Sequence, residues 1–178
     1  MCGIVGYIGS QRAQDFVVDG LEKLEYRGYD SAGIAVNTGA DSFAIVKKQG
    51  RLQNLADALV AAPLEGNVAI GHTRWATHGK PSDENSHPHF NANKTIVVVH
   101  NGIIENYLEL KTELLTKGYH FTSETDTEVV AHLLDSVYQG DILEATKKVL
   151  KRIRGAYALG IMAVSEPDRI IAVRKESP

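Results

Sequence analysis

The strand predicted at residues 94–102 constrains the fold more than any other stretch of this chain. It contains four consecutive apolar β-branched residues, Ile96, Val97, Val98 and Val99. Successive side chains of a strand point to opposite faces of its sheet, so an uninterrupted apolar run needs cover on both faces. We therefore expect this strand to lie in a sheet that other layers cover on both sides.

Apolar patterns elsewhere predict further strands and several helices. Short apolar runs indicate strands at 4–8, 32–36, 43–48, 67–74, 155–164 and 168–175. Apolar residues at helical spacing indicate helices at 13–24, 51–63, 106–118, 125–140 and 141–153. Strands in both halves of the chain, with helices between them, indicate sheets covered by helices. Residues 75–93 are polar and aperiodic, and a loop of this length is often functional.

Composition limits the class of protein. The chain has 19 Lys and Arg against 22 Asp and Glu and no basic stripe, which does not favour a nucleic-acid partner. Its single cysteine excludes an intrachain disulfide and fits a reducing compartment. No apolar run reaches transmembrane length, and no secretory signal opens the sequence. We expect a cytoplasmic protein that binds neither nucleic acid nor membrane.

The lone cysteine, Cys2, directly follows Met1 in the sequence MCGIVGYIG. A lone cysteine is commonly a small buried apolar residue. Removal of Met1, however, places a thiol and an α-amine on one leading residue. A free α-amine has a pKa of about 7.7–8.0 and serves as a base near neutral pH. We expect Cys2 to be an N-terminal nucleophile. With Met1 attached its nitrogen is an amide, so we expect a chain that keeps Met1 to represent an immature state.

The segment HNGIIENY, which ends the β-branched strand, offers an oxyanion site for such a nucleophile. The side-chain amide of Asn101 and the backbone N–H of Gly102 can converge on one oxygen atom. The missing side chain of Gly102 also lets a substrate approach the backbone closely. Because Asn-Gly is a common tight-turn pair, the residues alone leave a purely structural interpretation open.

The segment GHTRWATHG begins at the end of another predicted strand. Arg74 presents a fork of donors that suits a carboxylate, and Thr77 and His78 follow in the loop. A structural salt bridge accounts equally well for Arg74 alone.

The segment TSETDTEVV is a predicted helix start. Thr125 and Glu128 have the spacing of a capping box, which places Asp126 in the first turn, where the helix dipole favours it. The functional interpretation is that Asp126 faces a pocket and binds an ammonium group. The sequence does not decide between these interpretations.

Other polar residues have a weaker claim to function. Arg27 and Asp30 flank a glycine and can pair across a helix-to-strand turn, so we interpret them as scaffold, with Arg27 and Trp75 bordering the site. Seven histidines, including His87 and His89, raise the alternative of a metal-dependent hydrolase. Because no established metal-ligand spacing accompanies them, we expect no metal and no cofactor.

Together these motifs resemble the glutaminase domain of the glucosamine-6-phosphate synthase family, class II amidotransferases among the N-terminal nucleophile hydrolases. MCGIVGYIG, LEYRGYDSAGIAV, GHTRWATHG, VVVHNGIIENY and SETDTEV match in order up to about Val130, and RGAYALGIM matches less sharply. RGYDSAG with RWATHG resembles the hexosamine-forming branch rather than the purine branch. The resemblance implies an α+β fold, a four-layer αββα sandwich.

The resemblance also implies catalytic roles. Cys2 is the nucleophile, with its own α-amine as general base. Asn101 and Gly102 form the oxyanion hole. The thiolate attacks the side-chain amide of glutamine, ammonia leaves, and water releases glutamate from the thioester.

Binding roles follow from the same resemblance. Arg74 holds the α-carboxylate of glutamine, aided by Thr77 and His78 of a loop that closes over the substrate. Asp126 holds the α-ammonium. A zwitterionic substrate requires one cation, one anion and a fixed distance to the reacting carbon.

The family's full enzyme continues into an isomerase half that receives the ammonia and makes glucosamine 6-phosphate from fructose 6-phosphate. We expect residues 1–178 to be a glutaminase domain truncated at its C-terminal end, with the isomerase domains absent. We expect the full-length protein to be a homo-oligomer. The alternative is a catalytically inactive domain that senses glutamine or a sugar.

Overall fold

The β-branched strand β6 (Ile96–Gly102) lies between two apolar layers, as its sequence predicts. In the computed structural model, which describes residues 2–177, Ile96 and Val98 pack against helices. Val97 and Val99 pack against the other sheet. All four side chains are at most 1% exposed. The strand is therefore buried on both faces.

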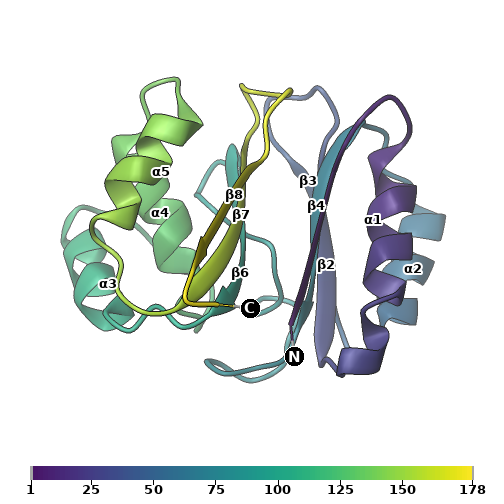
Figure 1. The fold of residues 1–178 in the computed structure, drawn as a ribbon, viewed down its shortest axis with the longest axis horizontal. Helices are drawn as coiled ribbons and strands as arrows, with labels where there is room; N and C mark the ends of the chain where they lie inside the picture. Colours follow the sequence, from purple (N-terminus) through teal and green to yellow (C-terminus); the bar gives the residue numbers. More distant parts are fainter. Residues whose placement is uncertain (1, 178) are drawn as a thin grey trace.

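Two antiparallel sheets of four strands each lie face to face (Figure 1). The first has the order β1-β4-β2-β3 and contains β1 (Gly3–Ile8), β2 (Ser31–Asn37), β3 (Ala44–Gln49) and β4 (Val68–Arg74). The second has the order β5-β6-β7-β8 and adds β5 (His89–Phe90), β7 (Tyr157–Ala163) and β8 (Ile171–Lys175). An apolar layer that includes Ile70, Phe43 and Met162 fills the space between the sheets.

Helices cover the two outer faces. Helices α1 (Ala13–Glu22) and α2 (Leu52–Ala61) lie on the first sheet (Figure 1). Helices α3 (Tyr107–Thr116), α4 (Glu128–Val137) and α5 (Ile142–Leu150) lie on the second. The predicted αββα sandwich is thus confirmed. Among residues 2–177, no helix is both long and apolar enough to cross a membrane.

The capping box predicted at Thr125 and Glu128 is wrong. Helix α4 begins at Glu128 itself, so Thr125 stands too far ahead of the first turn to cap it. The Glu128 carboxylate instead accepts backbone hydrogen bonds from Ser123 at 2.7 Å and Thr122 at 2.9 Å. The Thr125 hydroxyl lies 3.0 Å from Nε2 of His89. Glu128 thereby ties the segment before the helix to the helix start.

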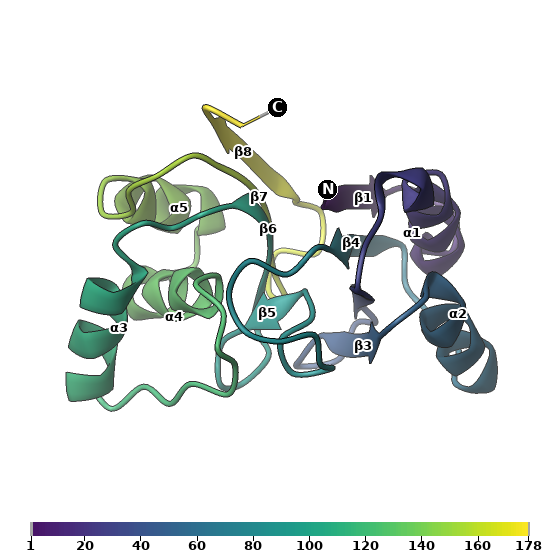
Figure 2. The same cartoon turned by 90° about the horizontal axis from the view of Figure 1, so that it is seen from below.

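The long polar segment between β4 and β6 is a loop, as predicted, with the short strand β5 near its end. Part of this loop is buried against the first sheet, including Asn85, Ser86 and His87. At Gly33 of β2, a Cβ atom would lie 2.1 Å from the carbonyl oxygen of His87. Glycine is required there because the loop backbone packs directly on the strand. Figure 2 shows the loop passing between the two halves of the fold.

Candidate active site

The inner face of β4 changes from apolar to polar toward its C-terminal end. Val68 and Ile70 belong to the apolar layer between the sheets. The period of two continues this face through His72 and Arg74, which are both buried. Polar side chains therefore end the inter-sheet layer at one edge.

The same change occurs on β6 and β1. Val97 and Val99 face the other sheet, and Asn101 follows on the same face. On β1, Ile4 packs in the inter-sheet layer, and Cys2 precedes it by two residues. Because β1 and β4 are antiparallel, with Gly3 opposite Thr73, the start of β1 lies beside the end of β4. Antiparallel pairing thus brings both strand ends to one place.

A cavity of about 250 Å³ opens at this edge. Its lining comes from the start of β1, the end of β4 and its loop, the end of β6 and the segment before α4. The lining residues are Cys2, Arg74, Trp75, Thr77, His78, His87, His100, Gly102, Ile103, Thr125, Asp126 and Thr127. Six of the predicted site residues therefore share one cavity with Trp75.

Cys2 is half-buried at the cavity and is held by both sheets. Its Sγ accepts a hydrogen bond from the backbone N–H of Trp75 at 3.1 Å. Its carbonyl oxygen accepts one from Nδ2 of Asn101 at 3.2 Å. Met1, on which the prediction of a free α-amine depends, lies outside the described residues.

Gly102 ends β6 in a conformation that excludes other residues. Its φ angle is +119°, and an added Cβ would lie 2.1 Å from the carbonyl oxygen of Ala156. Both the backbone angle and the close approach of β7 require glycine. The Asn-Gly pair is therefore the end of a buried strand at the cavity rather than the centre of a tight turn.

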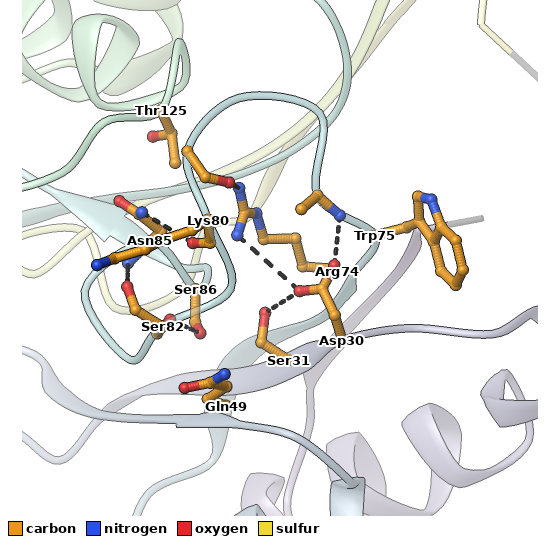
Figure 3. A network of polar contacts seen from close by, with 12 residues as sticks. Asp30, Ser31, Gln49, Arg74, Trp75, Lys80, Ser82, Asn85, Ser86 and Thr125 are labelled. Carbon is orange, nitrogen blue, oxygen red and sulfur yellow. Dashed lines mark hydrogen bonds and ion pairs between the residues drawn. The ribbon is translucent and has the colours of Figure 1, made fainter.

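Arg74 is 3% exposed, and its guanidinium lies between Asp30 and the loop after β4 (Figure 3). Nη2 donates hydrogen bonds to the carbonyl oxygens of His78 and Gly79. Nη1 lies 3.9 Å from Oδ1 of Asp30 and has no hydrogen-bond partner among the described residues. Burial lowers the pKa of Arg74 and the charge of Asp30 opposes this, but an arginine remains cationic. Arg74 thus places a buried cation at the cavity wall, and its guanidinium has hydrogen-bonding capacity left over.

Asp126 lies just before α4 rather than in its first turn, which corrects its predicted position. Its Oδ2 accepts a hydrogen bond from the backbone N–H of Ile104 at 2.7 Å. Its Oδ1 lies 4.0 Å from Nδ1 of His78. The side chain is 5% exposed. A buried carboxylate at the cavity wall suits an ammonium group.

The loop after β4 also supplies Thr77 and His78. Nδ1 of His78 lies 3.4 Å from the Thr77 hydroxyl, and its ring packs edge-on against Tyr107. Trp75 is 56% exposed at the rim and points away from the Arg74 network in Figure 3. Arg27 lies in the 3₁₀ turn Glu25–Arg27 after α1 and is not among the cavity-lining residues.

Comparisons with known proteins identify the family. A family model described as a glutamine amidotransferase domain matches residues 72–177. Over the whole chain, glutamine–fructose-6-phosphate aminotransferases (isomerizing) of Clostridium acetobutylicum and Clostridium perfringens are each 57% identical. The corresponding protein of Thermus thermophilus is 55% identical. This chain belongs to the glutamine amidotransferase domain family.

The amidotransferase domain spans only 29% of the length of each of these three relatives. Solved structures agree with the assignment. The glutamine phosphoribosylpyrophosphate amidotransferase of B. subtilis superposes with a TM-score of 0.78 at 30% identity, covering 92% of this chain and 35% of that one. An allosteric regulatory enzyme of purine biosynthesis superposes with a TM-score of 0.79 at 31% identity, covering 92% and 36%. The two-sheet sandwich is therefore that of the class II amidotransferases.

The sequence prediction did not assign a site role to two polar residues that contact the predicted site residues. Asp30 was assigned to the scaffold, but its carboxylate faces Arg74 and accepts a hydrogen bond from Ala76 N–H of the loop. His72 was not selected, although it contacts Asn101 at 2.7 Å. The alternation Val68, Ile70, His72, Arg74 was the available signal, because it places His72 on the same face as the arginine.

Histidines cluster between the sheets without forming a metal site. Burial lowers the pKa of His72 to about 3 and lowers the pKa values of His87, His89 and His100. All four are therefore neutral near pH 7. Among residues 2–177, no group of three or more His, Cys, Asp or Glu side chains is arranged to hold a metal ion.

Proposed function

We propose that this amidotransferase domain hydrolyses the side-chain amide of glutamine to glutamate and ammonia through a thioester on Cys2. One observation carries the proposal. Cys2, just before β1, lines one cavity with Arg74, Gly102 and Asp126, and its backbone carbonyl accepts a hydrogen bond from the Asn101 amide of the other sheet. A nucleophile, an oxyanion donor, a cation and an anion then surround one space.

Glutamine fits this arrangement through its two charges. The Arg74 guanidinium at the cavity wall receives the α-carboxylate, and the Asp126 carboxylate receives the α-ammonium. Thr77 and His78 close the loop over the bound amino acid. The buried positions of Arg74 and Asp126 strengthen both contacts, because water screens them little. The side-chain amide is left to reach the Cys2 sulfur.

The chemical steps follow from these positions. The thiol proton passes to the α-amine of Cys2, and the sulfur bonds to the amide carbon. The developing oxyanion accepts hydrogen bonds from Asn101 Nδ2 and Gly102 N–H. The C–N bond then breaks, and the departing nitrogen takes the proton and leaves as ammonia. Water then attacks the thioester and gives a proton to the same amine. The C–S bond breaks, glutamate leaves, and the sulfur takes the proton from the amine to restore the thiol.

The ammonia has a further use in a longer protein. The relatives are aminotransferases that act on fructose 6-phosphate, according to their names. We propose that an isomerase part beyond these 178 residues receives the ammonia and forms glucosamine 6-phosphate. Residues 1–178 then belong to the glutaminase domain of that protein. The homo-oligomer and the cytoplasmic location stay predictions.

Glutamate release from glutamine tests the proposal. Mass spectrometry first establishes that Met1 has been removed from the purified full-length protein. The processed protein should release glutamate, and Cys2→Ala should abolish the release. Because Cys2 is the single cysteine of residues 1–178, one iodoacetamide adduct within these residues should also abolish the release, and glutamine should slow the labelling. Retained turnover in Cys2→Ala would overturn the mechanism, and glutamine binding without hydrolysis would favour the sensing alternative.

A further inference from the structure

The hydrogen bonds around His72 determine which way the Asn101 amide points. Nε2 of His72 lies 2.7 Å from Oδ1 of Asn101 and 3.0 Å from the carbonyl oxygen of His100. Both of these oxygens are acceptors. Nε2 must therefore carry the proton, and His72 is in the Nε2–H tautomer with a bare Nδ1.

The reversed Asn101 amide does not fit this environment. Exchange of its oxygen and nitrogen would bring Oδ1 to 3.2 Å from the carbonyl oxygen of Cys2, where two acceptors repel. Nε2 of His72 would then have to accept from the amide, and its lone pair would face the carbonyl oxygen of His100. With the observed orientation, all three contacts are donor–acceptor pairs.

The cost of burying His72 indicates that its ring nitrogen is needed. The side chain is fully buried, and Nδ1 has no hydrogen-bond partner among the described residues. A buried unpaired nitrogen destabilises a fold, whereas an apolar ring would fill the same space without this cost. Packing alone does not explain a histidine here, since an apolar aromatic ring would stack on His87 at 4.2 Å equally well. The one contact that an apolar ring cannot make is the Nε2–H bond to Asn101 and His100.

We propose that His72 is a positioning residue that holds the Asn101 amide with Nδ2 toward Cys2 and its oxyanion. The inference rests on the proposed glutaminase function. One hydrogen of Nδ2 bonds the Cys2 carbonyl, and the other is left for the oxyanion. A reversed amide would present an oxygen to the developing negative charge. His72 acts only on the transition state, because the substrate's charged groups bind elsewhere in the cavity.

Two substitutions of matched chemistry test this role. In His72→Gln the amide nitrogen reaches about as far as Nε2 and keeps the donor, whereas in His72→Asn it reaches only as far as Nδ1. We expect His72→Asn to lower kcat for glutamate release by roughly ten- to a hundredfold, below the roughly 10²–10³-fold loss from removing an oxyanion donor. KM for glutamine should stay within about twofold of wild type, and His72→Gln should recover most of the lost kcat.

A double-variant cycle separates positioning from general destabilisation. In an Asn101→Ala background, His72→Asn should cost nothing further, because the group that His72 positions is gone. Additive losses, equal kcat values for the Gln and Asn variants, or a raised KM would overturn the proposal. Thermal unfolding of each variant shows whether it folds. If His72→Asn does not fold, the test of the proposal rests on the kcat and KM of His72→Gln alone.

Failure of the proposed function is distinguishable from failure of this inference. The ¹⁵N chemical shifts of the His72 ring report its tautomer without any turnover. An Nε2–H tautomer in a wild-type protein that releases no glutamate would overturn the glutaminase proposal but leave the amide orientation intact. An Nδ1–H tautomer would overturn the inference whatever the activity.

Discussion

Replacing Glu128 by Gln should destabilise the amidotransferase domain in a pH-dependent way. Burial alone would raise the pKa of this carboxyl, but hydrogen bonds from His132, Ser123 and Thr122 outweigh burial and lower it to about 2. Oε1 accepts from Thr122 N–H and Oε2 from Ser123 N–H. A glutamine can accept at only one of these places and turns an NH₂ group toward the other donor.

The shift gives the size of the effect. A pKa that falls from its ordinary value of 4.5 to about 2 on folding corresponds to roughly 3 kcal/mol of stability. Because the folded pKa is the lower one, this stability is fully present above about pH 4.5. It is lost as the pH falls toward 2, where folded and unfolded carboxyls are both protonated. We expect Glu128→Gln to lose roughly 3 kcal/mol at pH 7 and much less near pH 2.5.

Urea unfolding at a series of pH values measures this difference. The matched control is Glu113→Gln, which removes a partly exposed carboxylate paired with Lys117 and Arg152. Exposed ion pairs contribute roughly 0–1 kcal/mol, so the control should change stability little at any pH. A loss in Glu128→Gln that is equally large at pH 7 and pH 2.5, or no larger than in the control, would refute the reasoning.

Two further predictions concern the cavity itself. Gly102→Ala should abolish glutamate release and lower the melting temperature, because the added Cβ lies 2.1 Å from the Ala156 carbonyl oxygen; an active variant of normal stability would contradict the observed close packing. Asp126→Asn should lower kcat/KM for glutamine roughly 10- to 100-fold. This loss corresponds to a charge-assisted hydrogen bond that contributes about 1.5–3 kcal/mol. Glutaramate, which lacks the α-ammonium, should be hydrolysed equally slowly by wild type and Asp126→Asn; a further loss with this analogue would show that Asp126 does not bind the ammonium group.

Local sequence was enough to predict the layers of this fold. The run Ile96–Val99 required cover on both faces, and the two faces pack against helices and against the other sheet. Helices and strands were predicted because alternation and helical spacing depend on neighbouring residues alone. Helix ends were less predictable. Thr125 and Glu128 have the spacing of a capping box, but Glu128 bonds Ser123 and Thr122 instead, a competition that spacing does not reveal.

The sequence by itself determined which residue types were available for catalysis: one thiol at position 2, an Asn-Gly pair after a strand, and an arginine and an aspartate near element ends. Only the tertiary structure decided that they lie together at a cavity, because strand register and the stacking of two sheets bring together positions roughly 25 to 125 residues apart. The same packing decided the role proposed for His72. Its contact with Asn101 joins two sheets, and no local pattern encodes a hydrogen bond between them.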